Sequence, residues 1–451
     1  MKYNYQKVYQ DKLTTPQMVV EKLRSGNHIF YGEFVLFPEV LDQALYQRMA
    51  SGSLKDVVIE SVCLTRPPAV TKDPALKGLF QIEDWHFGAI SRNLYGAGIA
   101  AYKPITYHQG PRIIRKYRDY DAIFLPTTPM GPKGNFNYGV SNSITSAILD
   151  KAKMIVVEVN SSIPKCLGGN QESIHISRVT HVVEGNNTPL AQVMPAEPTE
   201  VETQIAQHLI KEIEDGACLQ LGIGGLPNVI GEMLAESDLK DLGLHTEMMV
   251  DSCVNLYERG RITGARKLID KYKMVYTFAL GTQKLYDFLD DNPVCASFPV
   301  NYVNDPRRIC VNPKVVAINN AVEVDLFSQV ASETVGPRHI TGTGGQLDFI
   351  FGAFNSEGGK GIISLSSTHT TRTGKWKSRI VPTLSTGSVV TVPRSIVQYV
   401  ATEYGVVQLK GKSTWERAEA LIGIAHPNFR DALIKDAEKL GIWRRSNRLA
   451  A

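Results

Sequence analysis

Short apolar runs rich in β-branched residues alternate with amphipathic segments in the first half of the chain. The runs at 28–32 (HIFYG), 57–62 (VVIESV), 122–126 (AIFLP) and 154–160 (MIVVEVN) are bounded by loops, which is typical of strands in a parallel sheet. The segments at 14–26 and 38–52 predict helices, since each ends on a glycine and the first places Thr15 before Pro16 as an N-cap. Together the segments predict βαβ units and an α/β fold.

The same pattern restarts after residues 185–200, a segment rich in Pro, Asn and Thr that we interpret as a linker. A predicted helix at 200–216 leads to a strand at 218–221 and a second helix at 227–237, and further strands are predicted at 274–280, 315–319 and 361–366. A chain of 451 residues is too long for one ordinary core. We therefore predict two similar α/β domains, 1–190 and 200–451, each an open mixed or parallel sheet covered by helices.

Composition narrows the class of protein but does not give its function. Hydrophobic residues make up 43% of the chain and charged residues 21%, which is ordinary for a globular protein. A net charge of +4 gives no case for nucleic acid as the main partner. The six cysteines form no CxxC pair or zinc spacing, so we expect reduced thiols and no metal.

The chain also carries no predicted targeting or membrane segment. Its first residues lack the apolar stretch of a signal peptide, and no apolar run approaches the roughly 18 residues that cross a bilayer. We expect a cytoplasmic protein with no membrane partner.

The most prominent local motif is the glycine turn LGIGGLPN at 221–228, between a predicted strand and a predicted helix. Its glycines, Gly222, Gly224 and Gly225, allow a ligand to approach the backbone, and the N–H groups at the start of the helix favour negative charge. A dinucleotide turn fits poorly, because Pro227 occupies the third glycine position of G-x-G-x-x-G. An oxyanion site with the Ile223 N–H as one donor, and a plain strand-to-helix turn, both remain open.

Three acidic residues are candidates for a catalytic carboxylate. Glu247, in LHTEMMVD, follows a predicted strand one βα unit after the glycine turn, where α/β folds place their chemistry. Glu323, in NNAVEVD, and Glu333, in ASETVG, are alternatives of equal standing on pattern alone. An isolated acid of this kind is more often a solvated surface charge.

Two later segments are candidate ligand contacts. The glycine-rich loop TGTGGQLDF at 341–349 contains Gly344 and Gly345 and offers a second backbone approach to a ligand, although a flexible loop would look the same. Lys410 and Lys412, in LKGK, are candidates for contacts with ligand phosphates, or are simply solvated.

Taken in order, these segments resemble the acetyl-CoA hydrolase/transferase family, the class I coenzyme A (CoA) transferases. The resemblance covers nearly the whole chain and is carried by GIGGLPNVI, LGLHTEM, NNAVEVDLFSQVASETVG, TGTGGQLDF, ATEYGVVQLKGK and IAHPNFR, with GNFNYGVS and HISRVTHVVEGN in the first half. Within the family it is greatest to the butyryl-CoA:acetate and 4-hydroxybutyrate CoA-transferases.

The resemblance implies two CoA-transferase domains with the active site between them. It also implies that Glu247 is the nucleophile, and that oxyanion donors come from Ile223 and from Gly344 or Gly345, a choice that the sequence leaves open. Relatives with Gln at the position of Glu323 argue against that acid. No metal and no cofactor are implied other than CoA as acyl-carrier substrate, and the family usually forms dimers or tetramers.

The expected reaction transfers CoA between short-chain carboxylic acids, with butyryl-CoA and acetate as the first choice of substrates. A Glu carboxylate that forms a thioester with CoA gives covalent, ping-pong catalysis. The alternatives are a 4-hydroxybutyrate CoA-transferase, an acetyl-CoA hydrolase with water as acceptor, and a CoA- or dinucleotide-binding protein without turnover. Pro227 counts against the dinucleotide, and a pure binding protein has no need of Glu247.

Overall fold

The computed structural model describes residues 4–371 and 373–443, which form two compact units. Unit 1 contains the described residues up to Val193 together with Val275–Val303, and unit 2 contains Met194–Met274 and the described residues from Asn304 onward. The linker predicted at 185–200 does contain the first boundary. The segment 275–303 lies in unit 1, whereas the predicted second domain ran without interruption from 200 to 451.

Contacts within unit 1 explain why this segment belongs there. The rings of Phe34 and Phe278 stack with their centroids 3.8 Å apart, and Ser141 forms a β-bridge with Phe278. The Nδ2 atom of Asn142 donates to the carbonyl of Ser297 over 3.2 Å. The segment contains β14 (Phe278–Ala279), α10 (Gln283–Leu289), β15 (Cys295–Ser297) and α11 (Val300–Val303), and it begins within β13 (Met274–Tyr276).

The main sheet of unit 1 is parallel throughout and has the order β4-β3-β2-β1-β5-β7-β9. Its strands are β1 (His28–Phe30), β2 (Val57–Ser61), β3 (Phe80–Asp84), β4 (Ala100–Tyr102), β5 (Tyr120–Thr127), β7 (Ala152–Val159) and β9 (His181–Glu184). Every strand predicted in the first half is therefore confirmed. The sheet also contains β3, β4 and β9, which the sequence analysis did not predict.

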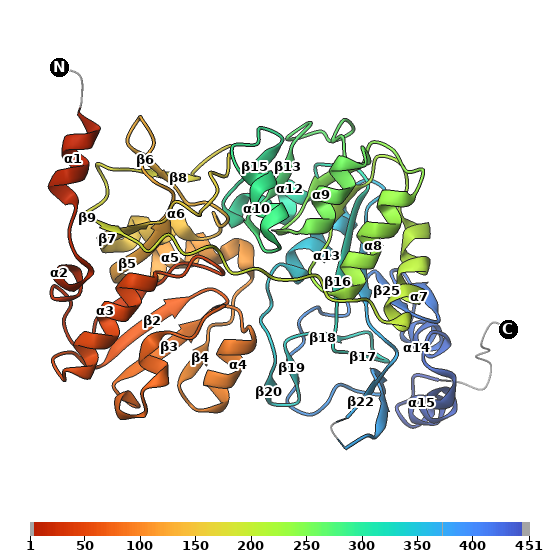
Figure 1. The fold of residues 1–451 in the computed structure, drawn as a ribbon. Helices are drawn as coiled ribbons and strands as arrows, with labels where there is room; N and C mark the ends of the chain where they lie inside the picture. The colour runs from red at the N-terminus through yellow and green to blue at the C-terminus, as the bar shows by residue number, and fades with distance from the viewer. Residues whose placement is uncertain (1–3, 372, 444–451) are drawn as a thin grey trace. The chain divides into compact units, whose positions relative to one another are not determined.

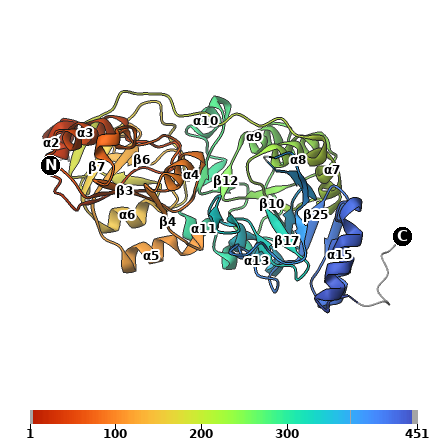
Figure 2. The same cartoon turned by 90° about the horizontal axis from the view of Figure 1, so that it is seen from below.

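Helices cover both faces of this sheet. Figure 2 shows α2 (Pro16–Val20) and α3 (Glu39–Ala50) on one face, and α5 (Gly110–Tyr117) and α6 (Thr145–Lys151) on the other. The remaining elements of the unit are α1 (Tyr5–Lys12), α4 (Ala89–Gly96) and the small antiparallel pair of β6 (Asn135–Asn137) with β8 (Ser173–His175). The core between β1, β2 and α3 includes Ile29, Leu41 and Ile59, each fully buried.

Unit 2 is built on a second parallel sheet. Within it the strands have the order β11-β10-β16-β21-β25-β26, and only β26 is antiparallel to its neighbour. The strands are β10 (Cys218–Gln220), β11 (Gly243–His245), β16 (Val315–Asn320), β21 (Lys360–Ser364), β25 (Tyr399–Thr402) and β26 (Gly405–Gln408). The repeated architecture of two parallel sheets in one chain agrees with the predicted fold class.

Helices flank the sheet of unit 2 on both faces. Figure 2 shows α7, α8 and α9 on one face and α13 on the other. These helices are α7 (Glu200–Leu209), α8 (Gly225–Glu236), α9 (Asp251–Glu258) and α13 (Gln346–Asn355), with the short α12 (Pro306–Ile309), α14 (Thr414–Gly423) and α15 (Pro427–Lys439) elsewhere in the unit. Minor strands are β12 (Met248–Met249), β17 (Glu323–Asp325), β18 (Val330–Ala331), β19 (Thr334–Val335), β20 (Arg338–His339), β22 (Thr368–Thr370), β23 (Trp376–Ser378) and β24 (Ile380–Val381).

N-cap residues predict where helices begin better than the glycines predict where they end. The Thr15 hydroxyl accepts from the Met18 N–H, as the N-cap predicts, but α2 ends at Val20 instead of continuing to the glycine at 26. Thr199 and Glu202 form a capping box that begins α7.

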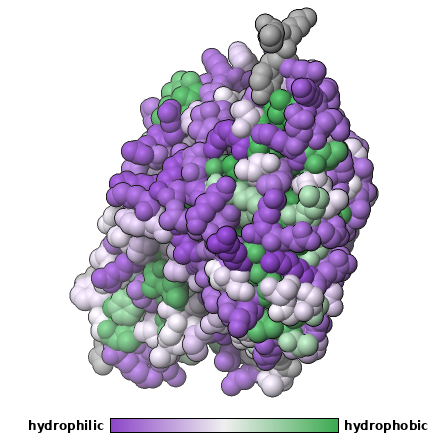
Figure 3. Space-filling model, turned by 90° about the vertical axis from the view of Figure 1, so that its left-hand side faces the viewer, coloured by the Kyte–Doolittle hydropathy of each residue, from purple (hydrophilic) through white to green (hydrophobic). Residues whose placement is uncertain are grey.

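The surface hydropathy and the cysteine side chains are typical of a globular protein. The face drawn in Figure 3 is largely hydrophilic, with hydrophobic side chains in small scattered groups. All six cysteines are free thiols, and four of them are buried. Among the described residues, no helix has the length and apolar character needed to cross a membrane.

Candidate active site

Two of the predicted site segments, the glycine turn and the segment with Glu247, lie at the carboxyl ends of two neighbouring strands of unit 2. In the parallel pair β10 and β11, Cys218 lies opposite Gly243 and Leu219 opposite Leu244. The glycine turn follows β10 and Glu247 follows β11, so the two segments emerge at the same edge of the sheet. Thr246 ties them together, because its hydroxyl donates to the Leu221 carbonyl over 3.2 Å.

The glycine turn leads directly into α8, which begins at Gly225. Gly224 has φ = 121°, a backbone conformation that favours glycine, and a Cβ added at Gly222 or Gly224 would have no atom within 4 Å. The side chain of Ile223 is 39% exposed. The turn therefore presents open backbone, as the oxyanion interpretation of Ile223 requires.

Glu247 is half-buried and is held by two groups from distant parts of the sequence. Its Oε2 accepts a hydrogen bond of 2.5 Å from Nδ2 of Asn304, a residue that is itself fully buried. The backbone N–H of Gly345 also donates to the carboxylate. A Cβ at Gly345 would lie only 1.9 Å from Oε2, so the backbone approaches the carboxylate as closely as glycine allows.

The sequence leaves open whether Gly344 or Gly345 is the backbone donor, and the contact at Gly345 is relevant to this choice. Gly344 has φ = 53°, and this left-handed conformation turns the chain so that Gly345 precedes α13. Gly345 is therefore the glycine whose N–H reaches Glu247. The carboxylate lies before the first turn of a ten-residue helix, where the helix dipole stabilises negative charge.

The electrostatic environment nevertheless favours the neutral acid in the free protein. Burial raises the pKa of Glu247 to about 8, and the nearby negative charge of Asp348 acts in the same direction. The hydrogen bonds from Asn304 and Gly345 oppose this rise, because they stabilise the anion. A carboxylate that is poorly solvated in this way is a better nucleophile than one in bulk water.

Asn304 is a further candidate site residue, which the sequence analysis does not predict. It lies just before α12 and in no glycine-rich or acidic motif. Its Oδ1 is buried without a hydrogen-bond partner among the described residues, while its Nδ2 donates to Glu247. In a buried side-chain amide both the oxygen and the nitrogen normally form hydrogen bonds. The unpaired Oδ1 of Asn304 therefore points to a functional role. A single sequence gives no signal for this contact, which arises from tertiary structure.

The two competing acids occupy different surroundings from Glu247. Glu323 is 6% exposed on β17, and the Ser385 hydroxyl lies 3.3 Å from both of its carboxylate oxygens. Glu333 is 4% exposed between β18 and β19, and its backbone carbonyl accepts from Ile340 and Thr341. Glu247 is distinguished by the donors on its carboxylate, which are Asn304 Nδ2 and the backbone N–H of Gly345.

The two lysines predicted to contact phosphates differ from each other. The Lys410 ammonium donates to the Ser395 carbonyl over 2.5 Å and lies 4.2 Å from the centre of the Phe354 ring. Its pKa is lowered by burial. Lys412 is exposed to solvent. Lys410 is therefore already engaged within the protein, and phosphate contacts of both lysines stay a prediction.

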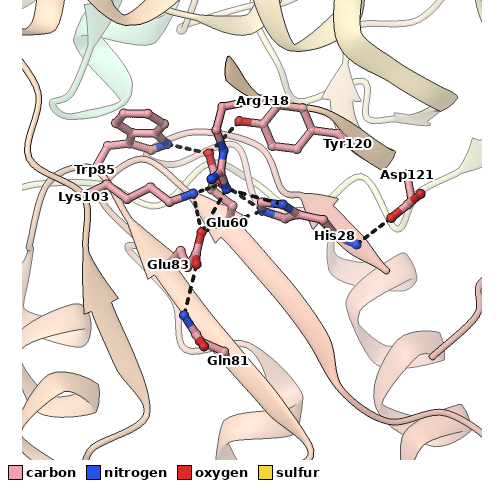
Figure 4. A network of polar contacts seen from close by, with 9 residues as sticks. All are labelled: His28, Glu60, Gln81, Glu83, Trp85, Lys103, Arg118, Tyr120 and Asp121. Carbon is pink, nitrogen blue, oxygen red and sulfur yellow. Dashed lines mark hydrogen bonds and ion pairs between the residues drawn. The ribbon is translucent and has the colours of Figure 1, made fainter. Parts of the chain in front are cut away.

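One cluster in unit 1 has the donor set of a metal site, namely His28, Glu60 and Glu83. Figure 4 shows that Lys103 and Arg118 point into the same cluster. Lys103 forms ion pairs with both carboxylates, and Nη2 of Arg118 lies 3.0 Å from Glu60 and 3.2 Å from Glu83. The protein thus provides its own cations where a metal ion would have to bind.

Glu60 is the centre of this network. Its Oε1 accepts from the Trp85 indole and the Tyr120 hydroxyl, both over 2.7 Å, and the residue is fully buried (Figure 4). Burial alone would raise the pKa of Glu60, but the hydrogen bond from His28 and the charge of Lys103 outweigh it and lower the pKa to about 2. We interpret the network as structural.

Family models match both halves of the chain. The acetyl-CoA hydrolase/transferase N-terminal domain matches residues 1–194, and the C-terminal domain of the same family matches residues 281–437. Among curated proteins, the chain is 47% identical to the butyryl-CoA:acetate CoA-transferase of Anaerostipes caccae, over 99% of this chain and 100% of that one. It is 37% identical to the 4-hydroxybutyrate coenzyme A transferase of Clostridium kluyveri, over 96% and 99%.

A solved structure has the same fold. The crystal structure of RipA from Yersinia pestis matches with a TM-score of 0.89 at 36% identity, over 98% of this chain and 100% of that one. The family models, the relatives and this structure agree with the resemblance inferred from the motifs. The chain belongs to the acetyl-CoA hydrolase/transferase family and is an enzyme of the CoA-transferase class.

Proposed function

We propose that the protein transfers CoA from butyryl-CoA to acetate, with Glu247 as the nucleophile. The observation that carries this proposal is the pair of donors on one carboxylate, Asn304 Nδ2 at 2.5 Å and the Gly345 N–H. Covalent catalysis needs a poorly solvated nucleophile with hydrogen-bond donors fixed beside it. Glu247 has both.

The proposed reaction exchanges the thioester in four steps. The Glu247 carboxylate attacks the thioester carbonyl of butyryl-CoA, which gives a butyryl-glutamyl anhydride and the CoA thiolate. The thiolate attacks the glutamyl carbonyl of the anhydride, releases butyrate and leaves a glutamyl-CoA thioester. Acetate attacks this thioester to give an acetyl-glutamyl anhydride and the thiolate, which then attacks the acetyl carbonyl. Acetyl-CoA leaves and the carboxylate is restored.

The donors around Glu247 suit these steps. When the thiolate attacks the glutamyl carbonyl, negative charge develops on a Glu247 oxygen, and Asn304 and Gly345 lie beside Oε2 to stabilise it. When Glu247 attacks the acyl group, the charge develops on the substrate oxygen instead. The open backbone at Ile223, at the same sheet edge, supports a role for its N–H as a donor there, with Gly222, Gly224 and Gly225 shaping the turn.

Our choice of butyryl-CoA and acetate as substrates rests on the sequence identity to relatives. The higher identity is to a protein named butyryl-CoA:acetate CoA-transferase, and the lower to one named for 4-hydroxybutyrate. We therefore place butyryl-CoA and acetate first and 4-hydroxybutyrate second. Hydrolysis, with water as acceptor, is the third alternative. CoA is expected as a substrate, with no resident cofactor or metal, and a cytoplasmic homo-oligomer remains our prediction.

Initial rates test the reaction and the substrates together. Butyryl-, propionyl- and 4-hydroxybutyryl-CoA are each offered with acetate, and these three and acetyl-CoA are then offered with water alone. The proposal expects the highest kcat/KM for butyryl-CoA with acetate and little loss of thioester in water. A higher kcat/KM for 4-hydroxybutyryl-CoA would favour the second alternative, and rapid loss of thioester without acetate would favour a hydrolase.

Trapping of the covalent enzyme–CoA intermediate tests whether Glu247 is the nucleophile. Incubation with butyryl-CoA alone should leave CoA attached to the enzyme, and borohydride reduction followed by peptide mass mapping should place the change on Glu247. Glu247→Ala should lose transfer by several orders of magnitude and still bind CoA. A label on Glu323 or Glu333 would contradict the assignment, and these residues serve as internal controls because each is a buried acid of the same unit.

A further inference from the structure

One buried acid of unit 1 has no part in the proposed reaction. Glu33 lies three residues after β1 and is only 1% exposed. Its Oε1 accepts from the Thr145 hydroxyl over 2.8 Å, and its Oε2 accepts from the Ser141 hydroxyl over 3.5 Å. The Ser143 hydroxyl also donates to this carboxyl group. Glu33 therefore organises the segment 141–145 around one side chain.

Ser143 has a backbone conformation that serine rarely adopts. Its φ is 39°, in the left-handed region, and a residue keeps such a conformation only where its surroundings enforce it. Its hydroxyl bonds to Glu33 and to the Tyr107 hydroxyl, and its N–H donates to the Thr277 carbonyl over 3.3 Å. Glu33 is thus one of the groups that hold Ser143 in its strained conformation.

Tyr107 and Ser143 together anchor a short helix. Tyr107 belongs to the 3₁₀ helix η3 (Tyr107–Gln109), which continues into α5, and Figure 1 shows α5 beside α6, the helix that follows Ser143. Helix α11 packs against η3 and α5. The Val300 N–H, at the start of α11, donates to the Ser143 carbonyl over 2.9 Å, and Val300 and Val303 are fully buried. Ser143 therefore fixes the beginning of α11 within unit 1.

The residue that follows α11 is Asn304, the proposed donor to Glu247. The chain passes from unit 1 to unit 2 at this point. Only Asn304 and Asp305 separate α11 from α12, and the Asp305 carboxylate caps α12 by accepting from the Arg307 N–H over 3.0 Å. Helix α12 packs against α13, the helix that Gly345 precedes. A connection of two residues between two anchored helices leaves the Asn304 backbone little freedom.

We propose that Glu33 is a positioning residue for the reaction, because through Ser143 and α11 it holds the Asn304 amide beside the Glu247 carboxylate. The inference rests on the proposed function for the role of Glu247. Glu33 acts through Asn304 and takes no part in the chemistry itself. A displacement of about 1 Å at a reacting group is enough to lower a rate substantially, so a donor must be held as well as present.

A double-mutant cycle distinguishes this role from a general loss of stability. Glu33→Ala should lower kcat about tenfold, which is less than the loss of about 10²- to 10³-fold expected when the donor is removed in Asn304→Ala. In the Asn304→Ala background, Glu33→Ala should lower kcat by about twofold at most, since the donor that it positions is already gone. The KM for butyryl-CoA should change little. Losses that multiply in the double variant would overturn the proposal.

A second variant decides the question if Glu33→Ala does not fold. Ser143→Gly removes the hydroxyl that bonds to Glu33, and glycine adopts a φ of 39° without strain. It should therefore fold and lower kcat about tenfold, by the same loss of positioning. An unchanged kcat in folded Ser143→Gly would overturn the proposal.

Glu158→Ala is the matched control. Glu158 is another buried acid of unit 1, and its carboxylate accepts from the backbone N–H groups of Val40 and Leu41 at the start of α3. The substitution should lower the stability of the protein and leave kcat unchanged. A fall in kcat equal to that of Glu33→Ala would show that any lost buried acid has this effect, and would also overturn the proposal.

The pKa of Glu247 gives a readout that needs no turnover. The hydrogen bond from Asn304 lowers this pKa, so Glu33→Ala and Ser143→Gly should raise it, by no more than Asn304→Ala does. The infrared band of the Glu247 carboxyl group, taken as the difference from Glu247→Gln, follows its ionisation in the free protein. An unchanged pKa in both variants would overturn the proposal. A raised pKa in a protein that transfers no CoA would refute the proposed function alone.

Discussion

The side-chain amide of Asn304 and the carboxylate of Glu247 are 57 residues apart in the sequence and 2.5 Å apart in the structure. Asn304→Ala removes this donor and should lower kcat about 10²- to 10³-fold, the usual cost of losing one oxyanion donor. Steady-state rates with butyryl-CoA and acetate check the loss. The control is Asn355→Ala, at the exposed last residue of α13, where Nδ2 donates to the Phe351 carbonyl. A rate within threefold of wild type would exclude Asn304 from the reaction.

Gly345 should tolerate no side chain. A Cβ there would lie 1.9 Å from Glu247 Oε2 and 2.3 Å from Asn304 Nδ2, so Gly345→Ala must displace one of them. We expect loss of most activity and a destabilisation of about 1–3 kcal/mol, as for other overpacked sites. Kinetics and urea unfolding measure the two effects. Gly423→Ala is the matched control, because a Cβ there meets no atom within 4 Å, and it should leave both unchanged.

The pH dependence should report the ionisation of Glu247. The nucleophile is the anion, and the pKa of Glu247 in the free protein is about 8. The kcat/KM for butyryl-CoA, which reports the free enzyme, should therefore rise about tenfold per pH unit from pH 6 and level off above pH 8. The hydrogen bond from Asn304 lowers this pKa, so Asn304→Ala should shift the rise to higher pH. A rate independent of pH between 6 and 8 would contradict this assignment.

The Glu60 network should stabilise unit 1. Glu60→Gln leaves Lys103 and Arg118 without a partner at that carboxylate, and we expect a loss of about 3–5 kcal/mol in the free energy of unfolding. Denaturant unfolding measures the loss, and Glu438→Gln, an exposed residue near the end of α15, provides the control. A loss below 1 kcal/mol would show that the network contributes little to stability.

The same network predicts a response to acid. The folded pKa of Glu60, about 2, lies below its ordinary value of 4.5. A carboxyl with a lowered pKa stabilises the fold fully above the ordinary value, and its contribution of about 3 kcal/mol is lost as the pH falls from 4.5 toward 2. Unfolding free energies measured from pH 6 to pH 3 should fall more steeply in the wild type than in Glu60→Gln. Parallel curves would contradict the shift.

The sequence predicted those features that depend on local pattern. The apolar runs located the principal strands, and the order of strand, glycine turn and helix placed Glu247 and the turn at one sheet edge. The sequence could not locate Asn304, because its contact depends on how the segment before α12 packs on the segment after β11. It could not predict that Gly345 approaches Glu247 either, since this approach depends on the backbone conformation of the loop, including the φ of 53° at Gly344. The sequence also gives no sign that the segment 275–303 packs in unit 1, because the stacking of Phe278 on Phe34 has no local signature.

The glycine turn has a practical consequence for enzyme engineering. Gly224 needs its glycine for conformational reasons, whereas Gly222 has neither a positive φ nor any atom within 4 Å of an added Cβ. A graded series at Gly222, from alanine through valine to leucine, would therefore fill the space in front of the turn stepwise without straining the backbone. Donor preference measured along that series would test whether the space in front of the turn sets the acyl chain length.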